Sequence, residues 1–220
     1  MIVSILNLQT QSFSRRIIRE WEILKFFIVP IIAHKRTAEL VPFDIDHEVT
    51  EGDHFHTGED VWTAFHTPGH APGHLCLLAE SDRSLIAGDM VAGEGTILIN
   101  PSEGSIREYI LSLEKLKTLT PSRLLPAHGA TLNDADTVLQ DYIYHRRQRI
   151  LQIWELLTET PQSTLQLAKQ IYTELPVAYL GMAAIQVHCG LLFLQEDCAV
   201  QEIDSLKGWI RRQSDYSITI

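Results

Sequence analysis

Short apolar runs dominate the first 130 positions of the chain. Each run is shorter than a typical helix, and Gly, Pro, Asp or Ser stands near most of their ends, which is typical of strands. The runs are I-V-P-I-I-A-H (28–34), V-W-T-A-F (61–65), L-C-L-L-A (75–79), S-L-I-A-G (84–88) and S-R-L-L-P-A-H-G-A (122–130). The pattern therefore predicts a strand at each of these places.

Two stretches of the same region repeat apolar residues with the period of a helix. Residues 14–27 and 106–119 place an apolar side chain at every third or fourth position, as an amphipathic helix does. The positions are Ile17, Trp21, Leu24 and Phe27 in the first stretch, and Ile106, Ile110, Leu113 and Leu116 in the second. Strands mixed with helices predict an α/β (α+β) fold class.

The pattern changes after Asn133. A long helical run covers 134–158, and two shorter ones cover 163–173 and 179–194, with Ser163 or Thr164 as N-cap of the first of these two. The segment C-A-V-Q-E-I (198–203) then predicts a short strand. Three helices followed by a strand suggest a small winged-helix unit. We therefore expect two domains, residues 1–140 and residues 141–220.

Composition and charge narrow the function classes. The 220 residues are 45% hydrophobic and carry a formal net charge of −10, which argues against a generic binder of nucleic acid or anionic membranes. Three cysteines without C-x-x-C spacing favour a reducing compartment. The most apolar stretch, 23–32, is short and interrupted by Lys25 and Pro30, and the first ten residues do not resemble a secretory signal. A soluble cytoplasmic protein is expected.

Three predicted strands end in residues that can bind a metal. H-T-P-G-H places His66 and His70 on a tight turn after one strand, G-D places Asp89 after another, and P-A-H-G places His128 after a third. Imidazole and carboxylate are common zinc ligands. One such strand end would be weak support, but three in order indicate a metal site.

These motifs, in this order, resemble those of the metallo-β-lactamase superfamily of hydrolases. The stretch G-D-M-V-A-G-E-G-T-I and the helical tail are most similar to the group labelled β-lactamase-like protein 2, whose members carry a C-terminal winged helix. The resemblance covers about 28–215 and implies an αββα sandwich with two zinc ions between its sheets. It also implies that His70 binds the first ion, Asp89 bridges both, and His128 binds the second. Asp89 would then be catalytic, by orienting a metal-bound hydroxide or accepting its proton.

Four other histidines lie near these motifs. His66 is interpreted as supporting a ligand or as structural, because the resemblance assigns the ligand to the later histidine of H-T-P-G-H. His74 is a candidate for a role near the metals. His54 and His56 form an H-x-H pair that is predicted to be a surface turn, with substitution for missing ligands as the alternative.

The superfamily's strongest motif, H-x-H-x-D-H, does not occur in this sequence. Its place falls near residues 6–16, L-N-L-Q-T-Q-S-F-S-R-R, where no side chain is a good zinc ligand. We therefore expect a partial sandwich with an incomplete first sheet and weak metal affinity. S-F-S-R-R can be encoded so that the next reading frame gives H-S-A-G-A, which resembles the end of the motif stretch, so an N-terminus that is truncated or read out of frame is one hypothesis.

Three functions stay open at this point. The first is a metal-dependent hydrolase that acts on an ester, thioester, lactam or phosphodiester of a small-molecule substrate. The second is an inactive family member that serves as an interaction module, which the absent motif favours. The third is an RNA-binding or RNA-cutting protein, which the tail argues against, because residues 141–220 hold seven Lys and Arg against nine Asp and Glu. A homodimer is also left open.

Overall fold

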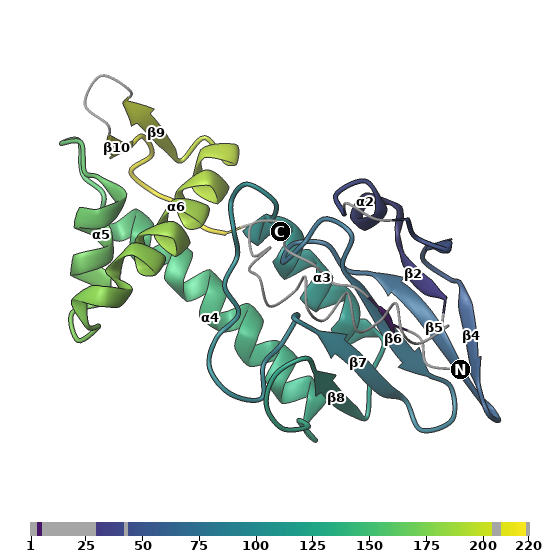
Figure 1. Ribbon diagram of the computed structural model, residues 1–220. Helices are drawn as coiled ribbons and strands as arrows, with labels where there is room; N and C mark the ends of the chain where they lie inside the picture. The colour runs from purple at the N-terminus through teal and green to yellow at the C-terminus, as the bar shows by residue number, and fades with distance from the viewer. Residues whose placement is uncertain (1–3, 6–29, 42–43, 204–207, 219–220) are drawn as a thin grey trace.

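A computed structural model describes residues 4–5, 30–41, 44–203 and 208–218, and all structural statements below concern this part of the chain. The predicted helix at 14–27 lies outside it. The main sheet has five strands in the order β4-β5-β6-β7-β8 (Figure 1). They are β4 His54–Thr57, β5 Asp60–His66, β6 Leu75–Ala79, β7 Ser84–Gly88 and β8 Arg123–Pro126. Neighbours pair antiparallel except β7 and β8, which are parallel.

A second, smaller sheet packs against one face of the main sheet. It contains β1 Ser4–Ile5, β2 Ile31–His34 and β3 His47–Val49, all parallel, with the short helix α2 Lys35–Ala38 directly after β2. A small apolar cluster joins the sheets, with Ile32 and Val49 on one side and Ala64, Leu75 and Leu77 on the other. The two sheets are therefore adjacent layers, as the predicted sandwich requires.

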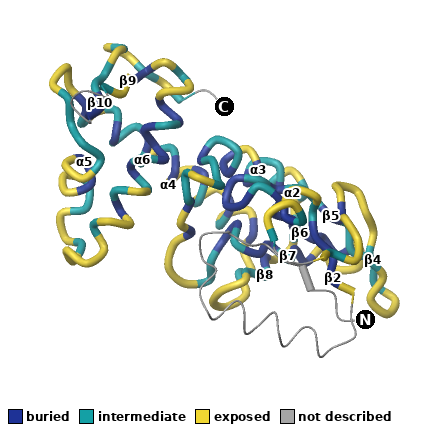
Figure 2. Tube along the Cα trace, turned by 45° about the horizontal axis from the view of Figure 1, so that its top comes forward, coloured by how far each residue is buried: buried dark blue, intermediate teal, exposed yellow. Residues whose placement is uncertain are grey.

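Helices cover the opposite face of the main sheet. They are α3 Ile106–Thr118 and α4 Ala135–Leu156 (Figure 1). All five residues of β6 are buried, because Cys76 and Leu78 point to the helices while Leu75 and Leu77 point to the small sheet. Figure 2 shows this burial concentrated in the centre of the sheet, whereas the β4–β5 turn is exposed. The central strands therefore consist of continuous apolar runs.

The helix α3 follows directly from its sequence. Ser105 caps its N-terminus by accepting a hydrogen bond from the Glu108 backbone N–H at 3.3 Å. Its predicted apolar face is buried, and Leu113 and Leu116 are fully inaccessible. Burial of a side chain of this size stabilises the fold by about 1.5–3 kcal/mol. The predicted periodicity is therefore confirmed.

The tail consists of helices and a hairpin. The elements are α5 Thr164–Ile171, the 3₁₀ turn η2 Val177–Tyr179, α6 Leu180–Glu196, β9 Val200–Ile203 and β10 Gly208–Arg211. Ser163 caps α5 in a capping box with Gln166, as the sequence predicted. By length and composition, the segment Val177–Glu196 is apolar enough to cross a membrane, but α6 also contacts α3, α4 and α5, which is the environment of a core helix.

Charged and polar contacts attach the tail to the main sheet's helices. Arg107 of α3 pairs with Glu196 at 2.6 Å and with Asp197 at 2.5 Å, and its guanidinium lies 4.0 Å from the centre of the Phe193 ring. Gln186 of α6 binds both the N–H and the carbonyl of Ile99, at 3.1 and 2.8 Å. The loop before α3 and the tail are therefore joined by specific contacts.

The structure differs from the sequence prediction in several short elements. His54 and His56 do not form a turn, because they lie on β4 and the turn follows at Gly58, which has φ +66°. Two further strands, β3 at residues 47–49 and β10, were not predicted from the sequence. These segments carry little apolar pattern of their own and become strands through pairing with a neighbour.

The cysteines provide a test of this packing. Cys76 and Cys189 are buried, and burial raises the pKa of their thiols to about 12 and about 11, whereas Cys198 is exposed. We expect iodoacetamide at pH 8 to label only Cys198 in the folded protein, at least about 100-fold faster than the other two, because the thiolate is the reacting form. Mass spectrometry of tryptic peptides measures this, and Cys198→Ser should leave the native protein unlabelled. Rapid labelling of Cys76 would contradict the packing of β6.

Candidate metal centre

The loop that joins β5 to β6 carries two of the predicted histidines, His70 and His74, while His66 is the last residue of β5. It closes on itself through a hydrogen bond from the Thr67 N–H to the His74 carbonyl at 2.9 Å. At Gly69, where φ is +128°, a Cβ would lie 2.2 Å from the backbone nitrogen of Tyr109. Glycine is therefore required for the loop to touch the start of α3. This contact presents His70 at the strand end, as the sequence predicted.

The other two predicted ligands follow neighbouring strands. Asp89 comes directly after β7, and His128 lies two residues beyond β8. The Ala127 N–H donates to the Gly88 carbonyl at 3.0 Å, and the Gly93 N–H donates to the His128 carbonyl at 2.9 Å. Because β7 and β8 are parallel, their carboxyl ends lie at the same edge of the sheet. The two segments are thus fixed side by side.

The side chains of His70 and His128 both approach the carboxylate of Asp89. His70 Nε2 lies 3.7 Å from Asp89 Oδ2, and His128 Nε2 lies 3.7 Å from Asp89 Oδ1. Asp89 is therefore flanked by one imidazole at each of its oxygens. The His128 side chain is 79% exposed, whereas those of His70 and Asp89 are 11% and 19% exposed. The site is consequently open on the His128 side.

A backbone carbonyl orients the His70 ring. His70 Nδ1 lies 3.1 Å from the Leu98 carbonyl oxygen, which can only accept, so Nδ1 carries the proton in this hydrogen bond. Nε2 therefore holds the lone pair of the neutral ring on the side of Asp89. Burial lowers the pKa of His70, although the Asp89 carboxylate and the Leu98 carbonyl act in the opposite direction. An anchored, neutral ring of this kind is suited to metal binding.

His74 contacts Asp89 through the backbone. The Asp89 N–H donates to His74 Nε2 at 3.1 Å, so this nitrogen is unprotonated and Nδ1 carries the ring proton. His74 Nδ1 then donates to Thr67 Oγ1 at 2.8 Å. His74 is fully buried, and burial lowers its pKa to about 3, so the ring is neutral at physiological pH. His74 holds the backbone of Asp89 in place, a role that the loop sequence alone did not reveal.

The remaining candidate histidines have partners elsewhere. His66 stacks on His34 with ring centres 4.0 Å apart, and its Nε2 lies 2.9 Å from the Pro72 carbonyl. His54 Nδ1 lies 3.1 Å from Thr63 Oγ1 and 3.8 Å from Glu80, and His56 is an exposed residue of β4. Within the described part of the chain, none of these three histidines forms a hydrogen bond or ion pair with Asp89.

His70, Asp89 and His128 are residue types that bind zinc, but they are too few to complete a site. A zinc ion in a protein takes three or four protein ligands. His70 with Asp89, and Asp89 with His128, would provide two ligands for each of two ions. Within the described part of the chain, no group of three or more His, Cys, Asp or Glu side chains is arranged to hold a single ion. The described residues therefore do not complete a zinc site by themselves.

Two layered sheets with a His–Asp–His cluster at the strand ends define an α/β fold of the metallo-β-lactamase type. The chain belongs to the metallo-β-lactamase superfamily, whose sequence profile matches residues 10–128. This superfamily is metal-dependent. The predicted family and α/β class are thereby confirmed at this level.

Relatives agree with this assignment. The β-lactamase-like protein 2 homolog of Drosophila melanogaster is 32% identical over 161 residues, covering 71% of this chain and 53% of that protein. A probable metallo-hydrolase of Bacillus subtilis is 26% identical over 152 residues, covering 63% and 47%. The chain thus spans about half the length of the curated relatives it matches.

Solved structures show the same fold. A β-lactamase domain protein from Burkholderia ambifaria superimposes with a TM-score of 0.70 at 24% identity, covering 82% of this chain and 57% of that chain. A metallo-β-lactamase family protein from Thermus thermophilus gives 0.68 at 17% identity, covering 92% and 67%. At these identities the likeness concerns the fold alone.

Proposed function

We propose that this chain is a metal-dependent hydrolase of the β-lactamase-like protein 2 type, with His70, Asp89 and His128 as metal ligands. The observation that carries the proposal is the position of one imidazole at each oxygen of Asp89. The names of the relatives from Drosophila and Bacillus support the same class. The expected ions are zinc, and the expected substrate is a small ester, thioester, lactam or phosphodiester.

The residues of the chain have separate roles in this proposal. Asp89 accepts a proton from the attacking water, because it is the carboxylate at the centre of the cluster. His74 is a positioning residue, since it accepts the Asp89 N–H and remains neutral. Leu98 orients the His70 ring through its carbonyl.

A second candidate function is a non-catalytic interaction module. It is favoured by the absence of H-x-H-x-D-H from the sequence and by the shortage of ligands in the described chain. A role on RNA is less well supported. In the basic stretch 145–150, Arg146 is buried and Arg147 is paired with Glu114, so these two arginines do not form an open basic face.

Metal content separates the two candidates. Under the hydrolase proposal, which needs ligands beyond His70, Asp89 and His128, purified protein dialysed against trace zinc retains about two ions per chain by elemental analysis and hydrolyses at least one member of a panel of esters, thioesters, lactams and phosphodiesters. Retained metal would show that further residues complete the site. Near-zero metal together with no turnover would overturn the hydrolase proposal and favour the interaction module.

A further inference from the structure

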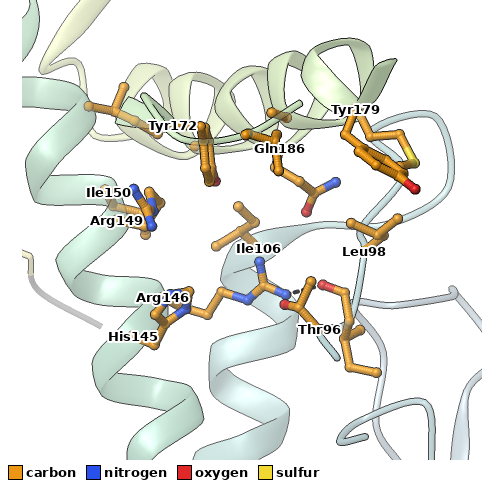
Figure 3. Close-up of a pocket in the computed structure, with 16 residues that line it drawn as sticks. Thr96, Leu98, Ile106, His145, Arg146, Arg149, Ile150, Tyr172, Tyr179 and Gln186 are labelled. Atoms are coloured by element: carbon orange, nitrogen blue, oxygen red, sulfur yellow. Dashed lines mark hydrogen bonds between the residues drawn. The ribbon is translucent and has the colours of Figure 1, made fainter. Parts of the chain in front are cut away.

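A pocket lies between the tail helices and the loop that precedes α3 (Figure 3). Its volume is about 330 Å³, at the lower end of the range of small-molecule sites, roughly 300–1,000 Å³. Side chains of α4 form one wall, α6 and the segment before it form a second, and residues 96–98 form a third. His70, Asp89 and His128 are not among its lining residues, so it is a different place from the metal centre.

The pocket is apolar inside and at its mouth. Ile106, Ile150 and Ile153 form its buried floor. Leu98, Tyr179 and Met182 border it and are 40%, 51% and 42% exposed. Exposed apolar side chains that form a contiguous patch are typical of an interaction or ligand-binding site.

Among the described residues that line the pocket, the basic side chains all come from α4. Arg146 and Arg149 project from α4 toward the cavity, and His145 lies beside them (Figure 3). Arg146 is buried and donates to the Ile97 carbonyl, while Arg149 donates to Gln152 Oε1 at 2.6 Å and lies 4.6 Å from the Tyr172 ring centre. In the described chain, Arg107, Arg123 and Arg147 form ion pairs with carboxylates, whereas Arg146 and Arg149 do not.

Two cationic groups without a carboxylate partner in the described chain leave an excess of positive charge at this wall. Burial and the charges of Arg146 and Arg149 lower the pKa of His145, which agrees with a locally positive field. A buried charge is costly unless it is paired, so an anion at this wall would be stabilised. Arginine also binds carboxylates with two parallel hydrogen bonds.

We propose that this pocket binds a medium-chain carboxylate, an organic anion with an apolar body. Its carboxylate would lie at Arg149 and Arg146, and its chain would cover Ile106 and Ile150 and leave between Tyr179 and Met182. Among the described residues that line the pocket, none is anionic and would oppose this arrangement. Binding does not depend on hydrolysis, so it is tested on metal-free protein.

The loop at the pocket also contacts the metal centre. Arg146 binds the Ile97 carbonyl, Gln186 binds Ile99, and between them the Leu98 carbonyl holds His70 Nδ1. The Leu98 side chain borders the pocket while its carbonyl orients His70. A bound carboxylate would therefore touch the residue that positions a proposed ligand of the metal.

Isothermal titration with decanoate and with decanol tests the proposal. We expect decanoate to bind at one saturable site, and decanol to bind at least about tenfold more weakly, because a neutral hydroxyl does not form the charge-assisted hydrogen bonds that a carboxylate forms with arginine. Equal affinities for the two probes would overturn the assignment of an anion site.

Three variants locate the site. Arg149→Gln should weaken decanoate binding about tenfold, whereas Arg212→Gln, which removes the same charge from an exposed residue bound to Gln201, should leave it unchanged. Ala183→Leu fills the cavity without changing charge and should also reduce binding at least about tenfold. Thermal unfolding confirms that each variant is folded. Unchanged binding in both Arg149→Gln and Ala183→Leu, or an equal loss in Arg212→Gln, would show that decanoate binds elsewhere.

Discussion

Replacement of Asp89 by asparagine is expected to reduce hydrolysis by at least about 100-fold, and to remove most of the bound metal. The amide has the shape of the carboxylate, but it is neutral and does not accept a proton at physiological pH. It would therefore leave the His70 and His128 imidazoles without the anion that lies 3.7 Å from each. Two ligand pairs share this one side chain, so a single substitution affects both proposed ions.

The measurement is kcat/KM on the panel member that the unmodified protein turns over best, together with metal content. Asp136→Asn is the matched control, because Asp136 is an exposed carboxylate that pairs with Lys117 at 3.0 Å on the surface of the helices. Exposed pairs contribute little, so this variant should keep full activity and metal. Retention of both by Asp89→Asn would remove Asp89 from the proposed centre.

Substitution of Gly69 by alanine is expected to destabilise the fold by about 3 kcal/mol or more. The backbone at φ +128° is open to glycine only, and strain of this kind costs about 1–3 kcal/mol. The new Cβ would also lie 2.2 Å from the Tyr109 nitrogen and 2.3 Å from its Cα, so the loop or α3 would have to shift. Overpacking of this kind adds about 1–3 kcal/mol.

Gly58→Ala separates the two contributions. Gly58 also has positive φ, +66°, but nothing lies within 4 Å of the position of a Cβ there. This control should lose about 1 kcal/mol, from backbone strain alone. Denaturant unfolding followed by circular dichroism gives both free energies. Equal losses in the two variants would mean that the contact between the β5–β6 loop and α3 is not tight.

Much of the fold could be predicted because local pattern and tertiary environment agree. The runs at 75–79 and 84–88 are β6 and β7, since strands buried on both faces need continuous apolar sequence, and the run at 61–65 is the half-buried strand β5. Ser105 and Ser163 cap α3 and α5 because a side-chain oxygen satisfies backbone N–H groups that a helix leaves unpaired. Local chemistry of this kind is visible in the sequence.

The candidate site was predictable in part for the same reason. His70, Asp89 and His128 each follow a strand, and parallel β7 and β8 bring two of them to one edge. The contact of His74 with the Asp89 N–H was not predictable, because the two residues are 15 positions apart and meet only through the pairing of β6 with β7. The pocket at Arg146 and Arg149 was missed as well, since H-R-R-Q-R-I is typical of a solvated basic stretch until its burial is known.

The sequence by itself therefore determined the family, the central strands, the main helices and the order of the three proposed ligands, because these depend on residue type and spacing. Only the tertiary structure decided that Asp89 lies between two imidazoles, that His74 holds its backbone, and that Arg146 and Arg149 enter an apolar cavity. The physical reason is that distance, burial and hydrogen-bond direction between residues far apart in the chain are set by packing, which no local pattern encodes.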